Sequence, residues 1–341
     1  MEKPYKESKK RISINDVARH AGVSRSTVSL VMNSSDLISE ATKRKVEQAI
    51  VETGYVYNRN AASLRSKKSK IIGLLISDIK NPFYSEVLRG VEEVIDQENY
   101  SLLIGSTSDM ADKQNKLISA MLEQRIDGLL LSPSSGTSSD MIKSIKQASV
   151  PFILFARTIP DIEADYVGVD YSLGIRKVME HLILNGHKDI AFLNYYKKSS
   201  ISEERLKGFC EMAEDYGLDF KSDMMVDCMM NFDAAKKAVI ELMSRPVKPT
   251  AIICYNDIIA CGVTLGLSSL GISIGSKGIA VIGADDIDIA TYWTPKISTT
   301  TSRSYEVGKL ATQILLERIN NEDGPKRKLL LTPELIIRES G

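Results

Sequence analysis

The chain has 341 residues, of which 43% are hydrophobic and 26% charged, an ordinary globular composition with no apolar run long enough to span a membrane. Its 44 basic and 44 acidic side chains cancel, yet residues 1–70 hold 15 basic and 7 acidic ones, a net of +8. Residues 71–341 hold 29 and 37, a net of −8. The start MEKPYKESKKR has no apolar core, so it is not a secretory signal peptide. We therefore expect a cytoplasmic protein whose basic N-terminal part binds nucleic acid or another anionic partner.

Residue types used in catalysis and metal binding occur without the spacing that these functions need. The sequence contains no nucleophile elbow, no phosphate-binding loop and no dinucleotide fingerprint after its first strand. The four cysteines form no CxxC pair, and we expect them to be reduced packing residues. The acidic group Asp285, Asp286 and Asp288 is more typical of a solvated loop than of a metal site. We therefore expect no enzyme activity, no metal and no cofactor.

Residues 13–57 contain three short helical patterns. Ser13 and Asp16 can form a capping box before the first helix, and Ser24 can cap the second, RSTVSLVM. Only AGVS lies between the apolar patterns of these two helices, which is the spacing of a helix-turn-helix. A plain three-helix scaffold is the alternative, but clustered basic charge on so small a unit favours DNA binding.

From Ile71 onward, short apolar runs alternate with amphipathic helical patterns. The predicted strands are IIGLLIS, SLLIGS, DGLLLS, PFILF, DYVGVD, DIAFL, TAIICY and IAVIGA. Buried runs that alternate with helices indicate parallel sheets covered on both faces, and so many units fit two doubly wound α/β subdomains better than one sheet. In such folds ligands bind beyond the carboxyl ends of the strands.

Polar and aromatic residues follow directly after several of these strands. Phe83 and Tyr84, in NPFY, come after the first strand, where aromatic faces can pack on a sugar or on a planar base. Any one of the polar residues can instead be a loop residue or a helix cap, and Asp170 and Asp257 are as easily explained in that way. Together they suit a polyhydroxylated or weakly charged ligand. The predicted ligand-binding residues at strand ends are Phe83, Tyr84, Ser132, Arg157, Asp170, Asn256, Asp257 and Asp285.

The segment SINDVARHAGVSRSTVSLVMN resembles the LacI/GalR family of bacterial transcription regulators. The similarity continues in order through NRNAASLRSKKSKIIGLLISDIKNPFYSEVLRGVE, HLILNGHKDIAFL, ERLKGF, PTAIICYNDIIACG and IGADDID, and it extends from Ser13 to Arg338. Within the family, STVSLV, NRNAASLR and CYND are most similar to the maltose-regulon regulator subgroup. The resemblance implies a homodimeric, sequence-specific DNA-binding regulator, which we expect to be a repressor.

The resemblance also implies a domain organisation: a helix-turn-helix head, a hinge helix and a core like the periplasmic sugar-binding proteins. In this family the core chain crosses between its two subdomains three times. We place a disordered leader at residues 1–12, the head at 13–57, the hinge at 58–70 and the core at 71–341. The N-subdomain would comprise about 71–161 plus 302–330, and the C-subdomain about 162–301 plus 331–341.

By the same resemblance, the second helix lies in the major groove of operator DNA. Leu30 stands where the family often has arginine, so base reading rests on Arg25 and Ser26, or Leu30 contacts a thymine methyl group. The hinge would become helical on DNA, with Leu64 wedged into a base step of the minor groove. The predicted DNA-binding residues are Ser24, Arg25, Ser26, Thr27, Ser29, Leu30, Asn33, Asn58, Ala61 and Leu64.

The resemblance implies an effector, a sugar or sugar derivative, bound between the subdomains, and it adds Arg205 of ERLKGF to the effector-binding residues. Ala156 stands where the family usually has a carboxylate before Arg157, so we expect a pocket whose charge tilts positive. Neutral sugars rank first as effectors, and phosphorylated or acidic sugars second. A soluble carbohydrate-binding receptor without DNA function is the alternative, but such a receptor needs a secretion signal and no basic head.

Overall fold

The structure is a computed structural model that describes residues 12–32, 37–55, 68–195, 199–218, 222–320 and 324–341. The chain divides between Ser69 and Lys70 into two compact units, which we call the head and the core. Among the described helices, none is long and apolar enough to cross a membrane.

The head is built from three helices, α1 (Ile14–Ala21), α2 (Arg25–Met32) and α3 (Glu40–Thr53). The predicted capping box is present, because the backbone N–H of Ser13 donates to Asp16 Oδ2 at 3.0 Å. Gly22 ends α1 in the left-handed conformation, with φ 65°, and so allows α2 to begin three residues later. One valine from each helix is fully buried at the centre of the head: Val17, Val28 and Val46.

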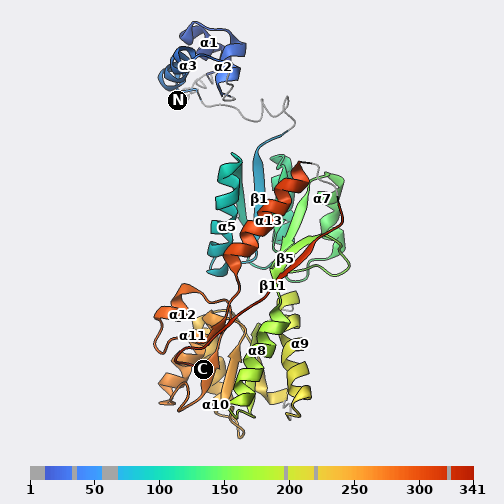
Figure 1. Ribbon diagram of the computed structural model, residues 1–341, viewed down its shortest axis with the longest axis vertical. Coiled ribbons are helices and arrows are strands. Elements are labelled where there is room, and N and C mark those ends of the chain that lie inside the picture. Colours follow the sequence, from blue (N-terminus) through green and yellow to red (C-terminus); the bar gives the residue numbers. More distant parts are fainter. Residues whose placement is uncertain (1–11, 33–36, 56–67, 196–198, 219–221, 321–323) are drawn as a thin grey trace, which may run out of the picture. The chain divides into compact units, whose positions relative to one another are not determined.

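The first part of the core, the six-stranded lobe, is a parallel sheet in the order β11-β5-β4-β3-β1-β2. Helices α5 (Phe83–Gln97) and α13 (Ser304–Ile319) lie side by side on one face of this sheet (Figure 1). Helices α6 (Ala111–Glu123) and α7 (Lys143–Gln147), with the short η1 (Ser139–Ile142), cover the other face. The strands are β1 (Ile71–Ile76), β2 (Ser101–Ser106), β3 (Gly128–Leu131), β4 (Phe152–Phe155), β5 (Asp165–Val169) and β11 (Lys328–Leu331).

The second part, the four-stranded lobe, is a parallel sheet in the order β7-β6-β8-β9. Its strands are β6 (Ile190–Tyr195), β7 (Met225–Cys228), β8 (Ala251–Cys254) and β9 (Ala280–Ile282). Its helices are α8 (Tyr171–Leu184), α9 (Ser200–Asp215), α10 (Phe232–Met243), α11 (Asp257–Ser269) and α12 (Asp288–Tyr292), with the short η2 (Ser222–Met224). Adjacent residues of β8 face opposite sides: Ile252 packs with α10 and α11, and Ile253 packs with α8 and α9. This two-sided burial explains the continuous apolar runs in the sequence.

The chain passes between the lobes three times. It leaves the six-stranded lobe after β5, returns between β10 (Thr299–Thr300) and α13, and leaves again after β11 to form β12 (Leu335–Ile336), which pairs with β10. The predicted first crossing at residue 161 is wrong, because β5 pairs with both β4 and β11 and so belongs to the six-stranded sheet. The third crossing also lies later than predicted, since β11 continues to Leu331. Hydrogen-bond partners decide the sheet to which a strand belongs, and its local sequence does not show them.

Candidate functional site

The second helix of the head presents its N-terminal residues to solvent. Arg25 and Ser26 are exposed at the first turn of α2. Ser24 is the helix cap, because its hydroxyl accepts from the backbone N–H of Thr27 at 3.0 Å. Leu30 is 38% exposed on the same helix. An exposed arginine beside hydroxyl groups at a helix N-terminus has the donors that base edges and phosphates accept.

The remaining predicted DNA-binding residues fall into two groups. Thr27 and Ser29 are half-buried on α2. The others lie outside the described residues, and these are Asn33, Asn58, Ala61 and Leu64.

In the core, Tyr84 lies at the carboxyl end of β1 with its hydroxyl fixed by two serines. The hydroxyl is 2.6 Å from Ser77 Oγ and 2.9 Å from Ser132 Oγ, and all three residues are buried. The ring meets Phe83 edge-on at 5.1 Å between centroids and Phe155 at 6.3 Å. The ring of Tyr84 is therefore held in place by its neighbours, and Ser132 acts by holding Tyr84.

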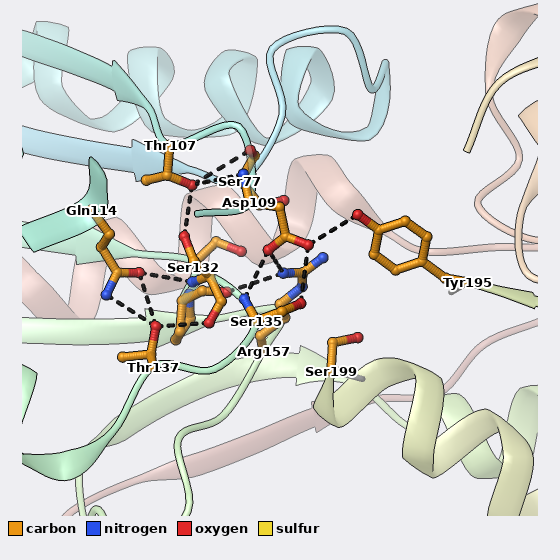
Figure 2. Close-up of polar contacts among 12 residues, drawn as sticks. Ser77, Thr107, Asp109, Gln114, Ser132, Ser135, Thr137, Arg157, Tyr195 and Ser199 are labelled. Carbon is orange, nitrogen blue, oxygen red and sulfur yellow. Dashed lines mark hydrogen bonds and ion pairs between the residues drawn. The ribbon is translucent and has the colours of Figure 1, made fainter. Parts of the chain in front are cut away.

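Arg157, after β4, forms a buried ion pair with Asp109, which follows β2 (Figure 2). Arg157 Nη1 donates to Asp109 Oδ1 at 2.6 Å and to the carbonyl of Pro133 at 3.2 Å. The backbone and hydroxyl of Ser135 donate to the same carboxylate at 2.8 and 3.0 Å. Burial alone would raise the pKa of Asp109, but the charge of Arg157 and the bonds from Ser135 hold it below its ordinary value.

A second buried ion pair joins Arg205 of α9 to Asp285, which follows β9. Arg205 Nη2 lies 3.2 Å from Asp285 Oδ1, and the guanidinium also donates to the backbone carbonyl of Tyr255. Its carbon lies 4.5 Å from the ring centroid of Tyr255 and 5.1 Å from that of Tyr171, within cation–π range. Burial raises the pKa of Asp285, although Arg205 opposes that shift.

These groups converge on a small cavity between the two lobes. Its volume is about 20 Å³, which is room for about one water molecule. Five of the predicted effector-binding residues line it, and these are Phe83, Tyr84, Arg157, Arg205 and Asp285. The other lining residues are Ser77, Asn81, Tyr171, Ile201, Met230 and Tyr255.

Three predicted effector-binding residues have local structural contacts. Asp170 caps α8 by accepting from the N–H of Leu173 at 2.8 Å. Asn256 caps α11 by accepting from the N–H of Ile259 at 3.1 Å. Asp257 is completely buried, where it accepts from the backbone of Ile287 and from the hydroxyl of Thr299. None of the three lines the cavity that the described residues enclose.

The expectation of a positive pocket is wrong for the described residues. The replacement of a carboxylate by Ala156 is offset by Asp109, which comes from a different strand end and neutralises Arg157. Three tyrosines at the cleft were not predicted, and these are Tyr171, Tyr195 and Tyr255. Tyr195 ends β6 and Tyr255 follows β8, so both stand at strand ends, where ligands bind in such folds, and both could have been selected from the sequence. The expectation that the acidic residues after β9 lie in a solvated loop is wrong for Asp285, whose side chain is 9% exposed and paired with Arg205. Among the described residues, no group of three or more His, Cys, Asp or Glu is placed to hold a metal ion.

Comparisons with known proteins agree with this architecture. Residues 13–58 match the bacterial regulatory proteins of the lacI family, and residues 69–339 match the periplasmic binding proteins and sugar binding domain of LacI family. The HTH-type transcriptional repressor PurR of Vibrio vulnificus is 33% identical, over 96% of this chain and 98% of that protein. The ribose operon repressor of Haemophilus influenzae and the maltose regulon regulatory protein MalI of Escherichia coli are each 31% identical with the same coverage.

Solved structures extend the similarity. The transcriptional regulator CelR–cellobiose complex superposes with a TM-score of 0.74 at 26% identity, over 97% of this chain and all of that one. The lac repressor dimer bound to operator and the anti-inducer ONPF gives a TM-score of 0.85 at 24% identity, over 97% and 99% of the two chains, and supports the fold. With a helix-turn-helix head, a core of two parallel α/β lobes and matches over nearly its whole length, the chain belongs to the LacI family of DNA-binding transcription regulators.

Proposed function

We propose that this regulator is a homodimeric repressor whose affinity for operator DNA is controlled by a neutral, polyhydroxylated effector bound between the two lobes. The observation that carries the proposal is the pairing of both cleft arginines with buried carboxylates, Arg157 with Asp109 and Arg205 with Asp285.

These pairs determine which ligand charge the site favours. Two cations and two anions leave no surplus positive charge for a phosphate or carboxylate. Hydroxyl groups suit such a site, because each can accept from a guanidinium and donate to a carboxylate. The rings of Tyr84 and Tyr255 add apolar surface for the faces of a sugar ring. A neutral sugar therefore ranks first, and a phosphorylated or acidic sugar second.

Solved structures of similar regulators with bound ligands support a neutral sugar as the class of effector. The CelR structure contains cellobiose, and a LacI family regulator from Enterococcus faecium contains ribose, at 25% identity and a TM-score of 0.70 over 79% of this chain and 98% of that one. Both ligands are neutral carbohydrates.

For the head, we propose that Arg25 and Ser26 read base edges and that Ser24, Thr27 and Ser29 contact phosphates. The exposure of Arg25 at the start of α2 supports this assignment. The role of the hinge residues Asn58, Ala61 and Leu64 stays a proposal from the family resemblance, as does that of Asn33. Homodimer formation is supported by the lac repressor, which was solved as a dimer on its operator.

Calorimetry on the purified chain tests the effector class. We expect D-ribose, cellobiose or another neutral sugar to bind and to change operator affinity, while the matching sugar phosphates do not. Asp285→Asn should weaken the binding, and a matched control, Asp170→Asn, should not. The control keeps its helix cap, because asparagine caps as well as aspartate, and it lies outside the cavity lining. Preferential binding of a sugar phosphate would contradict the neutral assignment.

A further inference from the structure

The two lobes are joined across the cleft by a direct side-chain bond. The hydroxyl of Tyr195, at the end of β6, donates to Asp109 Oδ2 at 3.0 Å. In Figure 2, Tyr195 reaches the carboxylate from the side opposite Gln114 and Thr137. A second bond, from the N–H of Thr158 to Ser200 Oγ at 3.0 Å, lies at the start of α9. Both bonds connect residues of the six-stranded lobe to residues of the four-stranded lobe, so they hold the cleft closed.

Asp109 is a fixed acceptor within its own lobe. Arg157 and Ser135 bind its two oxygens, and a buried chain of polar contacts supports the loop beneath it. In that chain, the hydroxyl of Ser134 donates to Thr107 at 2.7 Å, and the backbone of Ser134 donates to Gln114 at 2.7 Å. Because the carboxylate stays ionised beside Arg157, the bond from Tyr195 is charge-assisted and belongs to the stronger kinds of hydrogen bond.

Two buried donors at the cleft have no acceptor from the part of the protein that the structure describes. The Nε of Arg157 and the hydroxyl of Tyr171 are buried and have no hydrogen-bond partner among the described residues. Both side chains line the cavity. Burial raises the pKa of Tyr171 well above its usual range, so its hydroxyl keeps its proton and stays a donor. Neither donor has a described protein acceptor, so oxygen atoms from a ligand, or from the one water for which the cavity has room, can accept from both.

The size of the cavity links these observations. A space for about one water cannot hold a sugar ring, because pockets for small ligands measure hundreds of cubic ångströms. A ligand can enter only if the lobes move apart, and this movement breaks the bond between Tyr195 and Asp109.

We propose that the Tyr195–Asp109 bond is a latch between the lobes, and that an effector takes the place of Tyr195 on Asp109 while it supplies acceptors to Arg157 and Tyr171. The chain thus carries its own competitor for the effector site. The competition between Tyr195 and an effector for Asp109 rests on the proposed function, whereas the latch between the lobes does not.

A distance measurement on the full chain tests the latch without any ligand. One spin label goes on the native, exposed Cys210 of α9, and a second on a cysteine introduced by Gln124→Cys, at the exposed end of α6. The other three cysteines are buried and so are shielded from the label. Labelled chains are diluted with unlabelled ones, so that pulsed EPR reports distances within one chain.

Tyr195→Phe should shift the distances between lobes to larger or broader values, because it removes the hydroxyl and keeps the ring that packs 5.4 Å from Tyr255. Tyr292→Phe is the matched control, since it removes the hydroxyl of a tyrosine in the same lobe that is 84% exposed. Its distances should match those of the natural chain. An unchanged distribution for Tyr195→Phe, with unfolding temperatures equal in all three proteins, would overturn the latch.

Calorimetry with D-ribose and cellobiose as probes separates the two proposals. Without its internal competitor, Tyr195→Phe should bind a responsive probe roughly threefold or more tightly than the natural chain. If the distances shift but neither probe binds any variant, the latch stands and D-ribose and cellobiose are excluded as effectors. If a probe binds both proteins equally, the competition is wrong, and the carbohydrate assignment stands.

Discussion

Arginines in the head and in the core are placed in opposite ways. Arg25 is exposed at the start of α2 and forms no ion pair with a residue that the structure describes. Arg157 and Arg205 are 5% and 4% exposed, and each is paired with a carboxylate. The charge of Arg25 is therefore available to a partner molecule, whereas the charges of the cleft arginines are neutralised within the chain.

This difference indicates which charges, counted from a sequence, can be used to predict binding: those that remain solvated in the folded protein. The excess of +8 over residues 1–70 acts at a distance, because solvated charges add up over a surface. In the cleft a single neighbouring carboxylate cancels an arginine, and the identity of that neighbour depends on the fold. Counting residues near Arg157 in the sequence predicted a surplus of positive charge, which Asp109 offsets in the fold.

The largest expected effect comes from breaking one buried pair. Arg205→Met should lower the free energy of unfolding by about 3–5 kcal/mol, because it leaves Asp285 buried without its cation. Urea denaturation measures the loss. The double variant Arg205→Met with Asp285→Asn should recover a substantial part of it, since no unpaired charge remains. Equal losses in the single and double variants would show that the charge of Asp285 is not the cause.

A smaller loss of stability should distinguish a buried ion pair from an exposed one. Asp165 is completely buried and accepts from Arg318, while Glu40 pairs with Lys43 on the surface of the head. Asp165→Asn should cost about 1.5–3 kcal/mol at pH 7, and Glu40→Gln at most about 0.5 kcal/mol. Urea denaturation of both variants measures this contrast, and equal losses would contradict it.

Asp165→Asn should also change how the free energy of unfolding depends on pH. Burial acts to raise the pKa of Asp165, but Arg318, the backbone of Arg327 and Lys326 hold it below its ordinary value. A carboxyl with a lowered folded-state pKa contributes stability above its unfolded pKa, and this contribution is lost as the pH falls through the folded value. The gap in stability between the natural chain and Asp165→Asn should therefore narrow on acidification. A gap that widened instead would show that the pKa of Asp165 is raised.

In the head, Arg25→Ala should weaken operator binding by about 1–3 kcal/mol and relax specificity at one base pair. The stability of the head should stay unchanged, because the side chain is exposed. Selection of operators from a random library, followed by fluorescence anisotropy, checks both parts of the binding prediction. An unchanged base preference would remove Arg25 from base reading.

The smallest effect concerns Ser24, which caps α2 and is also proposed to contact phosphate. Ser24→Ala should destabilise the head by about 1 kcal/mol through loss of the cap. Hydrogen exchange of the α2 amides in the full chain measures this loss. Ser24→Asp should restore protection, because aspartate caps equally well, yet its negative charge should weaken operator binding. Full operator affinity in Ser24→Asp would place Ser24 away from the phosphates.

Local sequence determined most of the elements of this protein. The capping box of Ser13 and Asp16 and the left-handed Gly22 define the ends of α1 because their contacts lie within a few residues. Each of the eight predicted strands corresponds to a strand of the sheets, because burial on both faces leaves continuous apolar runs. The short strands β7, β10, β11 and β12 were not predicted, and β11 remains largely exposed at a sheet edge although it contains three consecutive leucines.

Only the tertiary structure decided how these elements combine. Strand-end residues such as Arg157 and Asp285 could be selected from sequence, but pairing Arg157 with Asp109 requires two loops 48 positions apart to meet. The membership of β5 in the six-stranded sheet depends on hydrogen bonds to β4 and β11, the second of which lies far along the chain. Asp170 and Asp257 look alike in sequence to Asp285, yet only Asp285 lines the cavity. Caps and helix ends follow from neighbours in the chain, whereas burial, charge pairing and cavity shape depend on neighbours in space.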